Sequence, residues 1–581
     1  MVKLIIDGNQ VEVKEGTTIL EAARANGIMI PSLCYQKGLN EIGACRVCVV
    51  EIKGMDRLVA SCNTVVEEGI EVFTNSPKVR TARITNVKLI LSQHDCNCAY
   101  CLRSGNCALQ EVANSLGLKK IDYKVDLPRP RKLDHFPLVR IEEKCIKCMR
   151  CIQVCDKVQD IGIWDVANTG SRTTVGVSGN RELTTSECVA CGQCVTHCPT
   201  GALTARDDTR KVFEYLADPE IITVVQIAPA VRAAWGESFG MTREKATVKR
   251  LVAALKKVGF NYVFDTDFSA DLTIMEEGTE FIERYTHRGD DKSPMFTSCC
   301  PGWVRYIKSQ YPDMVHMLSS AKSPQQMFGA VTKTYFAKKI GVDPAKIRCI
   351  SIMPCMAKKA ECEYPTMDST GTGPDVDIVI TTREADRIIA ADHINPIYLE
   401  EEEFDTPLGE GTGAAVIFGV TGGVMEAALR SAYFLLTKKN PDPDAFKAVR
   451  GCDGWKEAEF DLAGIPLKVA VASGLANTRK LMEAIRTGKK QYDFVEIMAC
   501  PGGCTGGGGQ PIHEGEELAC LRGDNLYGLD KHSDIRFSHE NQSVQTLYKE
   551  FFEKPNSHLA HELLHTDHEG WEMPKACKRH K

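Results

Sequence analysis

Apolar positions in the second half of the chain form short continuous runs that alternate with longer amphipathic stretches. The stretches at 245–259 and 321–341 have the spacing of helices with one apolar face. The continuous runs are long enough for buried strands and lie at 221–229, 262–267, 347–355, 376–382, 467–474 and 493–500. Buried strands that alternate with helices predict mostly parallel sheets covered on both faces. We therefore expect an α/β domain at 209–581, with functional residues at the carboxyl ends of its strands.

The first 208 residues have a different pattern, in which short elements are separated by cysteine-rich loops. Residues 4–13 predict two strands joined by a turn, and residues 17–27 predict a helix. Sixteen of the 26 cysteines fall between Cys34 and Cys198. This uneven distribution predicts an α/β and α+β multidomain protein, with small metal-binding domains at 1–78, 79–125 and 126–208.

Composition and charge argue against several classes of partner. The net charge of −6 is modest for 581 residues, and the absence of a basic stripe argues against nucleic-acid binding. No leader peptide follows Met1, and no apolar run approaches the length of a membrane span. Many cysteines without a leader predict a reducing, cytoplasmic location, and metal ligation rather than disulfides.

The first cysteine motif is C-x10-C-x2-C-x13-C, formed by Cys34, Cys45, Cys48 and Cys62. A strand-rich start followed by one tight cysteine pair suits a 2Fe-2S cluster in a β-grasp domain, although the spacing differs from the plant-type motif. A zinc site is the alternative, which the wide separation of two ligands disfavours. The spacing resembles that of the 2Fe-2S domains in complex I and in hydrogenases.

The second motif is H-x3-C-x2-C-x5-C, formed by His94, Cys98, Cys101 and Cys107. One imidazole and three thiolates suit zinc and an iron–sulfur cluster equally well. The spacing resembles that of the His-ligated 4Fe-4S cluster of complex I and the larger hydrogenases, which implies a 4Fe-4S cluster here. Cys96 is a competing candidate ligand.

The third motif consists of two C-x2-C-x2-C-x3-C runs, the pattern of bacterial two-cluster ferredoxins. In such ferredoxins the fourth cysteine of each run binds the other cluster. We therefore expect two 4Fe-4S clusters in a bacterial ferredoxin-like domain. One would be held by Cys145, Cys148, Cys151 and Cys198, and the other by Cys155, Cys188, Cys191 and Cys194.

Iron–sulfur clusters of this kind transfer electrons, so the chemistry is expected in the α/β domain. Three of its segments stand out: TSCCPGW (297–303), MPCMAKKAE (353–361) and EIMACPGGCTGGGGQP (496–511). The glycines of the third segment would let the backbone approach a bulky inorganic group, or they form a flexible loop. No Lys-Ser/Thr pair follows them, which argues against a phosphate-binding loop.

These three segments resemble, in order, the three motifs of the iron-only (FeFe) hydrogenases. The cysteine-rich residues 1–208 resemble the N-terminal part of the large multi-cluster members of that family. The resemblance implies a two-lobed catalytic domain around an H-cluster, a 4Fe-4S cubane joined to a diiron subsite with carbon monoxide, cyanide and a bridging dithiolate amine. It also implies that Cys300, Cys355, Cys500 and Cys504 bind the cubane, with Cys504 bridging to the diiron unit. The implied reaction is reversible conversion of dihydrogen to two protons and two electrons.

The resemblance further implies a proton relay. Taken alone, Cys299 is typical of a buried structural cysteine, and the helical stripe of Glu277, Glu280 and Arg284 is typical of a solvated face. In the family the matching residues carry protons. The expected proton path therefore runs through Cys299, Glu277, Ser319 and Glu280, with Arg284 near its surface end.

The pocket for the diiron unit is implied in the same way. Lys358 is expected to face a cyanide, with Glu361 holding its ammonium group. Several relatives carry a serine that contacts a cyanide where this chain has Ala230. The other expected lining residues are Ala228, Pro229, Ser323, Pro324, Gln325, Met353, Phe418 and Met498.

The implied partners are a ferredoxin- or flavodoxin-type electron carrier or NAD(P)H-oxidising partner subunits, together with maturation proteins for the diiron unit. The alternatives are an electron-transfer subunit, an iron–sulfur assembly protein and a sensory hydrogenase, none of which is expected to combine all these motifs. We expect the other cysteines to be structural, namely Cys96, Cys349, Cys362, Cys452, Cys520 and Cys577. The histidines at 558, 561, 565 and 568 predict a solvated terminal helix, with a metal site as the alternative.

Overall fold

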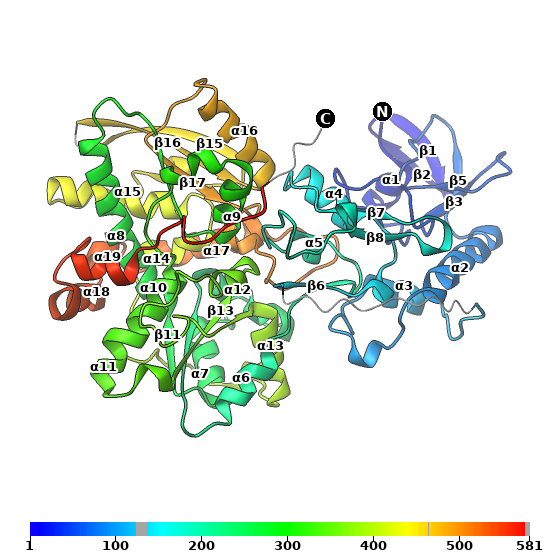
Figure 1. Cartoon of the computed structure of the whole chain (residues 1–581). Coiled ribbons are helices and arrows are strands. Elements are labelled where there is room, and N and C mark those ends of the chain that lie inside the picture. Colours follow the sequence, from blue (N-terminus) through cyan, green and yellow to red (C-terminus); the bar gives the residue numbers. More distant parts are fainter. Residues whose placement is uncertain (124–135, 463, 576–581) are drawn as a thin grey trace. The chain divides into compact units, whose positions relative to one another are not determined.

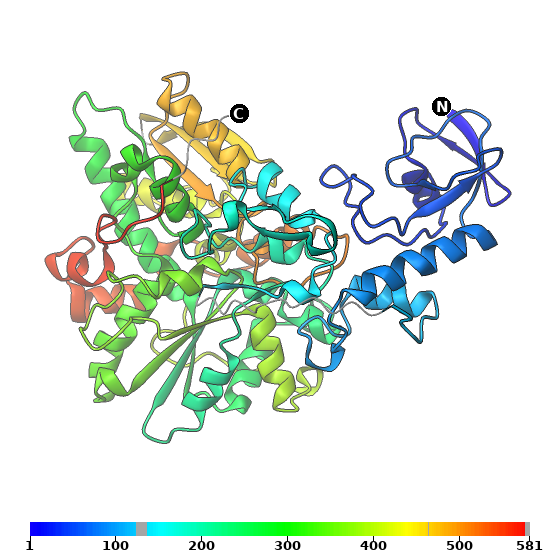
Figure 2. The same cartoon turned by 45° about the vertical axis from the view of Figure 1, so that its right-hand side comes forward.

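The computed structural model describes residues 1–123, 136–462 and 464–575, and it divides into two compact units (Figures 1 and 2). The expected boundary between residues 125 and 126, and Cys577, lie outside the described residues. The first unit comprises Met1–Lys157, Gly162–Leu183 and Gln193–Thr204. The second comprises Val158–Ile161, Thr184–Gly192 and Ala205–Lys581.

The first unit begins with a five-stranded sheet in the order β2-β1-β5-β3-β4. Strands β1 (Val2–Ile6) and β2 (Asn9–Val13) form an antiparallel hairpin, and helix α1 (Ile19–Ala25) begins after Thr18, whose hydroxyl accepts the N–H of Glu21. The predicted hairpin and helix are therefore confirmed. The other strands are β3 (Val49–Ile52), β4 (Val59–Ala60) and β5 (Glu71–Phe73).

The remainder of the first unit consists of short elements between cysteine-bearing loops. Its helices are α2 (Pro77–Ser92), α3 (Ala108–Ser115), α4 (Arg150–Lys157) and α5 (Gln193–Thr196). Its strands form two small pairs, β6 (Leu138–Arg140) with β9 (Leu203–Ala205) and β7 (Trp164–Ala167) with β8 (Thr174–Val177).

The second unit contains two four-stranded sheets (Figure 1). The first has the order β11-β10-β13-β14 and is parallel throughout, as its continuous apolar runs predict. Its strands are β10 (Ile222–Ile227), β11 (Tyr262–Asp265), β13 (Ile347–Met353) and β14 (Ile378–Thr381). Helix α7 (Val248–Val258) confirms the first predicted helix, whereas the second is divided by a π-helical turn into α10 (Pro324–Val331) and α11 (Ala337–Ile340).

The second sheet has the order β12-β17-β16-β15. Strands β12 (Met295–Phe296), β16 (Ile465–Ser473) and β17 (Phe494–Met498) are parallel, whereas β15 (Trp455–Leu462) is antiparallel to β16 and lies at the edge. The sequence of β15 alternates polar and apolar residues, which is typical of an antiparallel strand with one solvated face. Further helices of the second unit are α8 (Thr266–His287), α9 (Pro301–Gln310), α15 (Gly423–Thr437) and α17 (Ala519–Lys531).

The carboxyl ends of strands in both sheets carry the sequence motifs. Ala228 follows β10, Cys299 lies three residues after β12, Cys355 lies two residues after β13, and Cys500 lies two residues after β17. This arrangement agrees with the expectation that sites form where parallel strands end. Within the described part of the chain, no helix combines the length and the hydropathy that a membrane span requires.

Candidate active site and cluster-binding sites

Four cysteines from three distant segments meet in the second unit. Cys300 precedes α9, Cys355 follows β13, and Cys504 lies in the 3-10 turn Gly503–Gly506. These three line one cavity, and Cys500 lies close enough for its charge to affect Cys504. The structure therefore brings together the thiols that the sequence alone leaves far apart.

Burial controls the protonation of these thiols. Together with the neighbouring thiols, it raises the pKa of Cys355 to about 12 and the pKa of Cys504 well above its usual range. Four buried thiolates repel one another unless a cationic group binds them. The donor set therefore fits an iron–sulfur cubane.

The glycine run of the third segment packs tightly rather than forming a flexible loop. A methyl group at Gly507 or Gly509 would collide with the backbone of Pro354, next to Cys355. Gly502 and Gly503 have φ values of 74° and 84°, which favour glycine. These contacts hold the Cys504 turn against the Cys355 loop.

A buried ammonium group lies at the same cavity. Lys358 Nζ donates to a carboxylate oxygen of Glu361 at 2.9 Å and to the carbonyl of Cys299 at 3.1 Å. Burial alone would lower the pKa of Lys358, but Glu361 outweighs it, so the pKa is raised and the lysine stays charged. Glu361 also accepts from Ser323 at 2.9 Å and from Gln325 at 3.1 Å.

Most of the other predicted pocket residues line this cavity, whereas Ser323 and Glu361 lie behind it as partners of Lys358 and Gln325. Among the described residues, the buried Oε1 of Gln325 has no hydrogen-bond partner, which leaves a polar atom for a bound group. The lining residues are Ala228, Pro229, Ala230, Pro324, Gln325, Met353, Phe418 and Met498.

Cys299 and Glu277 begin a line of buried acid–base groups. Burial raises the pKa of Cys299 well above its usual value, and the nearby charge of Glu277 raises it further. Burial also raises the pKa of Glu277 to about 8, with a smaller contribution from Glu280. The Ser319 hydroxyl lies near Glu277, but among the described residues neither carboxylate oxygen completes a hydrogen bond at standard geometry.

Glu280 lies at the other end of this line. Its carboxylate accepts from the Ser319 hydroxyl at 2.7 Å, from the Ser320 hydroxyl at 2.9 Å and from Arg284 at 2.6 Å. Burial alone would raise the pKa of Glu280, but Arg284 and the hydroxyl donors outweigh it and lower the pKa. Glu277 is therefore protonated near neutral pH, whereas Glu280 is ionised.

This network has a branch that the sequence did not predict. His565 Nδ1 lies 2.8 Å from the Ser320 hydroxyl, and His565 Nε2 lies 3.1 Å from a carboxylate oxygen of Glu276. The expectation of a solvated terminal helix is wrong for this histidine, which is buried beside helix α19 (His558–Leu564). The apolar spacing of Ala560, Leu563 and Leu564 was the available signal, because it predicts a helix face packed on the core.

The first unit brings the first cysteine motif together in two pairs. Cys34 lies within hydrogen-bond reach of Cys45 and lowers its pKa, and Cys62 does the same to Cys48. All four thiols are buried. Two adjacent thiol pairs match a 2Fe-2S cluster, in which each iron takes two cysteines.

The second motif and the first ligand set of the third motif lie side by side in the first unit. One cavity is lined by Cys145, Cys148, Cys151 and Cys198. The N–H of Ala108, which follows Cys107, donates to the carbonyl of Pro199, and the sulfur of Cys101 lies against Gly201. Cys96 is exposed, and its thiol donates to the carbonyl of His94.

Two polar side chains join the first motif to the third. Asn40 donates to the carbonyls of Cys34 and Cys148, and Arg150 donates to the carbonyl of Cys34. The second ferredoxin-like ligand set is divided, since Cys155 and Cys194 belong to the first unit while Cys188 and Cys191 belong to the second. Among the described residues, no three His, Cys, Asp or Glu side chains converge closely enough to hold a single metal ion.

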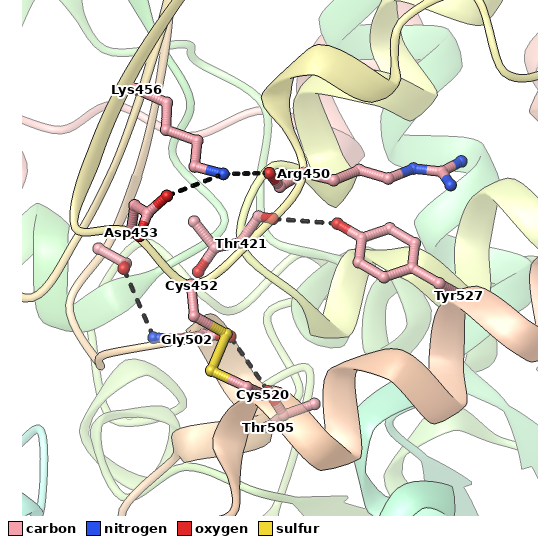
Figure 3. The surroundings of a disulfide bond; sticks show 10 residues. Thr421, Arg450, Cys452, Asp453, Lys456, Gly502, Thr505, Cys520 and Tyr527 are labelled. Carbon is pink, nitrogen blue, oxygen red and sulfur yellow. Dashed lines mark hydrogen bonds and ion pairs between the residues drawn. A yellow bond between two sulfur atoms is a disulfide. The ribbon is translucent and has the colours of Figure 1, made fainter.

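The expectation of metal ligation without disulfides is wrong for Cys452 and Cys520, which are bonded to each other (Figure 3). The fold brings the loop before β15 to the start of α17, with 6.0 Å between the two Cα atoms. A sequence separation of 68 residues gave no indication of this pairing. Cys349 and Cys362 are buried, as expected for structural cysteines.

Family models match five parts of the chain. Residues 221–508 match the C-terminal domain of the iron-only hydrogenase large subunit, and residues 516–571 match the iron hydrogenase small subunit. Residues 1–77 match a 2Fe-2S iron–sulfur cluster binding domain, and residues 144–202 match a 4Fe-4S dicluster domain. Residues 83–122 match the iron–sulfur binding region of NADH-ubiquinone oxidoreductase-G.

Curated relatives and solved structures agree with these matches. The NADP-reducing hydrogenase subunit HndD of Solidesulfovibrio fructosivorans is 46% identical over 97% of this chain and 98% of its own length. Iron hydrogenase 1 of Clostridium pasteurianum is 39% identical over 97% of this chain and 99% of its own length. The apo [FeFe]-hydrogenase HydA1 of Chlamydomonas reinhardtii superposes with a TM-score of 0.56 at 41% identity, covering 64% of this chain and 100% of that structure. The chain therefore belongs to the iron-only hydrogenases, enzymes that act on hydrogen, and it carries both 2Fe-2S and 4Fe-4S domains.

Proposed function

We propose that this hydrogenase reversibly converts dihydrogen to two protons and two electrons at an H-cluster held by Cys300, Cys355, Cys500 and Cys504. The observation that carries the proposal is the convergence of these thiols beside a buried ammonium group and a separate thiol, Cys299. When bound, the H-cluster supplies the heterolytic cleavage of hydrogen. The protein supplies placement, a dry cavity, and separate routes for protons and electrons.

The residues around the cavity support roles in holding the diiron unit. The Lys358 ammonium would face a cyanide, because Glu361 keeps it charged inside an apolar pocket. Gln325 presents an unpartnered carbonyl oxygen, while Met353, Phe418 and Met498 exclude water. Ala230 offers no side-chain donor where several relatives have a serine, so the backbone and Lys358 would carry more of the binding. We propose that maturation proteins deliver the diiron unit.

Protons would move between Cys299 and the surface through Glu277, Ser319 and Glu280. Glu277 is protonated near neutral pH and can give up a proton, whereas Glu280 is ionised and can accept one. This difference in protonation favours transfer of a proton outward, from Glu277 to Glu280. The Ser319 hydroxyl donates to Glu280 and lies near Glu277, so its rotation connects the two. Arg284 holds Glu280 at the outer end.

Electrons would pass through one 2Fe-2S and three accessory 4Fe-4S clusters, one of them ligated by His94. This electron path is supported by hydrogen bonds to the backbone of the expected ligands. Asn40, for example, donates to the carbonyls of both Cys34 and Cys148. In the second unit, Arg305 donates to the carbonyl of Cys188, and a methyl group at Gly192 would collide with Met356, the residue after Cys355. The proposed domains are 1–78, 79–125, 126–208 and 209–581.

We propose that NAD(P)H-linked partner subunits exchange electrons with the cluster domains at 1–208. The curated NADP-reducing relative is a subunit and aligns over nearly its whole length. A small ferredoxin- or flavodoxin-type carrier is the second candidate, because iron–sulfur clusters exchange single electrons with such carriers directly. Co-purification of the chain with its partners, followed by hydrogen-dependent reduction of NADP⁺ or ferredoxin, separates the two.

The reaction itself is tested by producing the chain with and without maturation proteins. The matured protein is expected to evolve hydrogen from reduced viologen and to oxidise hydrogen, whereas the same chain without the diiron unit is expected to do neither. A matured protein with a full iron content that is inert in both directions would contradict the proposal.

A further inference from the structure

The disulfide between Cys452 and Cys520 lies at the surface of the α/β domain and has no part in the proposed reaction. Both residues are exposed, and among the described cysteines only this pair is bonded. The other cysteines of the α/β domain in the described ranges are buried or half-buried. An external thiol therefore has more direct access to this disulfide than to the less exposed thiols of the cavity.

The disulfide encloses the turn that carries Cys504. On the side of Cys452, the carbonyl of Gly454 accepts the N–H of Ser473 at 2.8 Å, and the Ser473 hydroxyl accepts the N–H of Gly502 at 3.4 Å. On the side of Cys520, the methyl group of Ala519 packs so closely against Gly502 that a Cβ atom there would lie 2.7 Å from it. The same methyl group lies against Gly506, where the carbonyl of Pro501 leaves no room for a Cβ atom. Gly502 is therefore held between the two elements that the disulfide joins.

Further contacts tie the start of α17 to the same turn. Arg522 donates to the carbonyl of Thr505 at 3.3 Å, and the Thr505 hydroxyl donates to the carbonyl of Gly502 at 3.1 Å. Cys520 lies in the part of the chain that matches the iron hydrogenase small subunit, and Cys452 lies in the part that matches the large subunit. The disulfide is thus a covalent link between these two parts at the edge of the Cys504 turn.

We propose that the Cys452–Cys520 disulfide is a redox-reversible clasp on the turn that carries Cys504, opened by a protein or small molecule of the dithiol class. One thiolate of the dithiol attacks a sulfur of the disulfide and forms a mixed disulfide, which the second thiol then resolves. The dithiol is oxidised to a disulfide, and its two protons and two electrons convert Cys452 and Cys520 to free thiols. Opening leaves only the hydrogen bonds and the Ala519 contact to hold the turn.

The functional consequence rests on the proposed role of Cys504 as an H-cluster ligand, but the clasp itself does not. In the closed state the start of α17 is fixed over Gly502–Gly506, which restricts opening of the Cys504 turn. In the open state that turn opens more often, since a crosslink lowers the population of open conformations.

The test uses the full-length protein with its clusters, handled anaerobically. Labelling of exposed thiols with a maleimide, read by peptide mass spectrometry, is done before and after treatment with dithiothreitol. We expect Cys452 and Cys520 to be protected before treatment and labelled after it, while Cys349 and Cys362 stay unlabelled in both states. Labelling of both clasp cysteines before treatment, or protection of both after it, would overturn the proposal.

The effect on the turn is measured by hydrogen–deuterium exchange of the backbone amides at 502–507. We expect dithiothreitol to accelerate exchange there by about tenfold or more, with no change in β10. The variants C452S and C520S should match the reduced wild type and should not respond further to dithiothreitol. Unchanged exchange at 502–507 in reduced wild type and in both variants would refute the clasp. None of these readouts depends on hydrogenase activity, so failure of the proposed reaction would be recognised separately.

Discussion

Glu280 is the outer carboxylate of the proposed proton relay, and the variant Glu280→Gln tests that role. The carboxylate accepts from the Ser319 hydroxyl at 2.7 Å, from the Ser320 hydroxyl at 2.9 Å and from Arg284 at 2.6 Å. Glutamine keeps the shape of the side chain but carries no charge and cannot exchange a proton. Loss of one acid–base group typically lowers a rate by about 10²–10⁴-fold, and we expect hydrogen evolution to fall within that range.

The same substitution has a modest effect on stability. Arg284 is 39% exposed at its side chain, so water screens its ion pair with Glu280. The buried hydrogen bonds from Ser319 and Ser320 weaken, and we expect the free energy of unfolding to fall by about 1–3 kcal/mol. A change of this size leaves a large multidomain chain folded, so loss of turnover would report on proton transfer.

The pH dependence gives a second signal. The pKa of Glu277 is about 8 because the group is buried, with a contribution from the charge of Glu280. Glu277 therefore carries its proton at neutral pH and loses it as the pH rises through about 8, so hydrogen evolution should decline above that pH. In Glu280→Gln one of the charges that raise this pKa is removed, and the residual activity should decline at a lower pH.

The assay is hydrogen evolution from reduced methyl viologen across this pH range, with iron content measured on the same samples. The matched control is Glu283→Gln, the same substitution at an exposed position of the same helix, α8, which should leave the rate and its pH profile unchanged. Undiminished turnover in Glu280→Gln, or an equal loss in the control, would refute the relay.

Three further predictions concern other parts of the chain. Lys358→Met removes the buried ammonium group, so the protein should keep its cubane iron and lose the diiron unit, as iron content and infrared bands will report; retention of both would contradict the role of Lys358. Cys48→Ser should abolish the 2Fe-2S paramagnetic signal and lower NADP⁺-linked turnover while viologen-linked turnover persists, and equal loss of both would argue against a peripheral position for this cluster. Gly503→Ala places a methyl group at φ 84° against neighbouring backbone and should lower the free energy of unfolding by about 1–3 kcal/mol. Gly515→Ala, at φ 79° with open space around it, should cost less, and equal losses would show that the contact is unimportant.

The parallel sheets follow from local pattern, and the sequence therefore predicts them well. Strands β10, β13 and β17 are continuous apolar runs bounded by turns, and each forms close to its predicted position. Strand β15 was not predicted, because its alternating sequence is half polar and it pairs only at the sheet edge. The division of the helix at 321–341 also has no local signal, since its apolar spacing continues through the π-helical turn.

The candidate site depends on long-range convergence, which spacing does not encode. Gaps of 55 and 145 residues separate Cys300, Cys355 and Cys500, and within the sequence only the family resemblance associates them. His565 joins the Glu280 network through Ser320, across 245 residues. The Cys452–Cys520 disulfide was likewise unpredictable, because two exposed cysteines on different elements become neighbours only in the folded chain.

The infrared spectrum of anaerobically matured protein tests most directly whether Cys300, Cys355, Cys500 and Cys504 hold an organometallic cluster. Metal-bound carbon monoxide and cyanide absorb where no protein group does, so the spectrum is independent of any electron partner. We expect bands from both ligands in the wild type and their absence in Cys504→Ser. A fully iron-loaded wild-type sample that shows neither set of bands and does not react with dihydrogen would contradict the account.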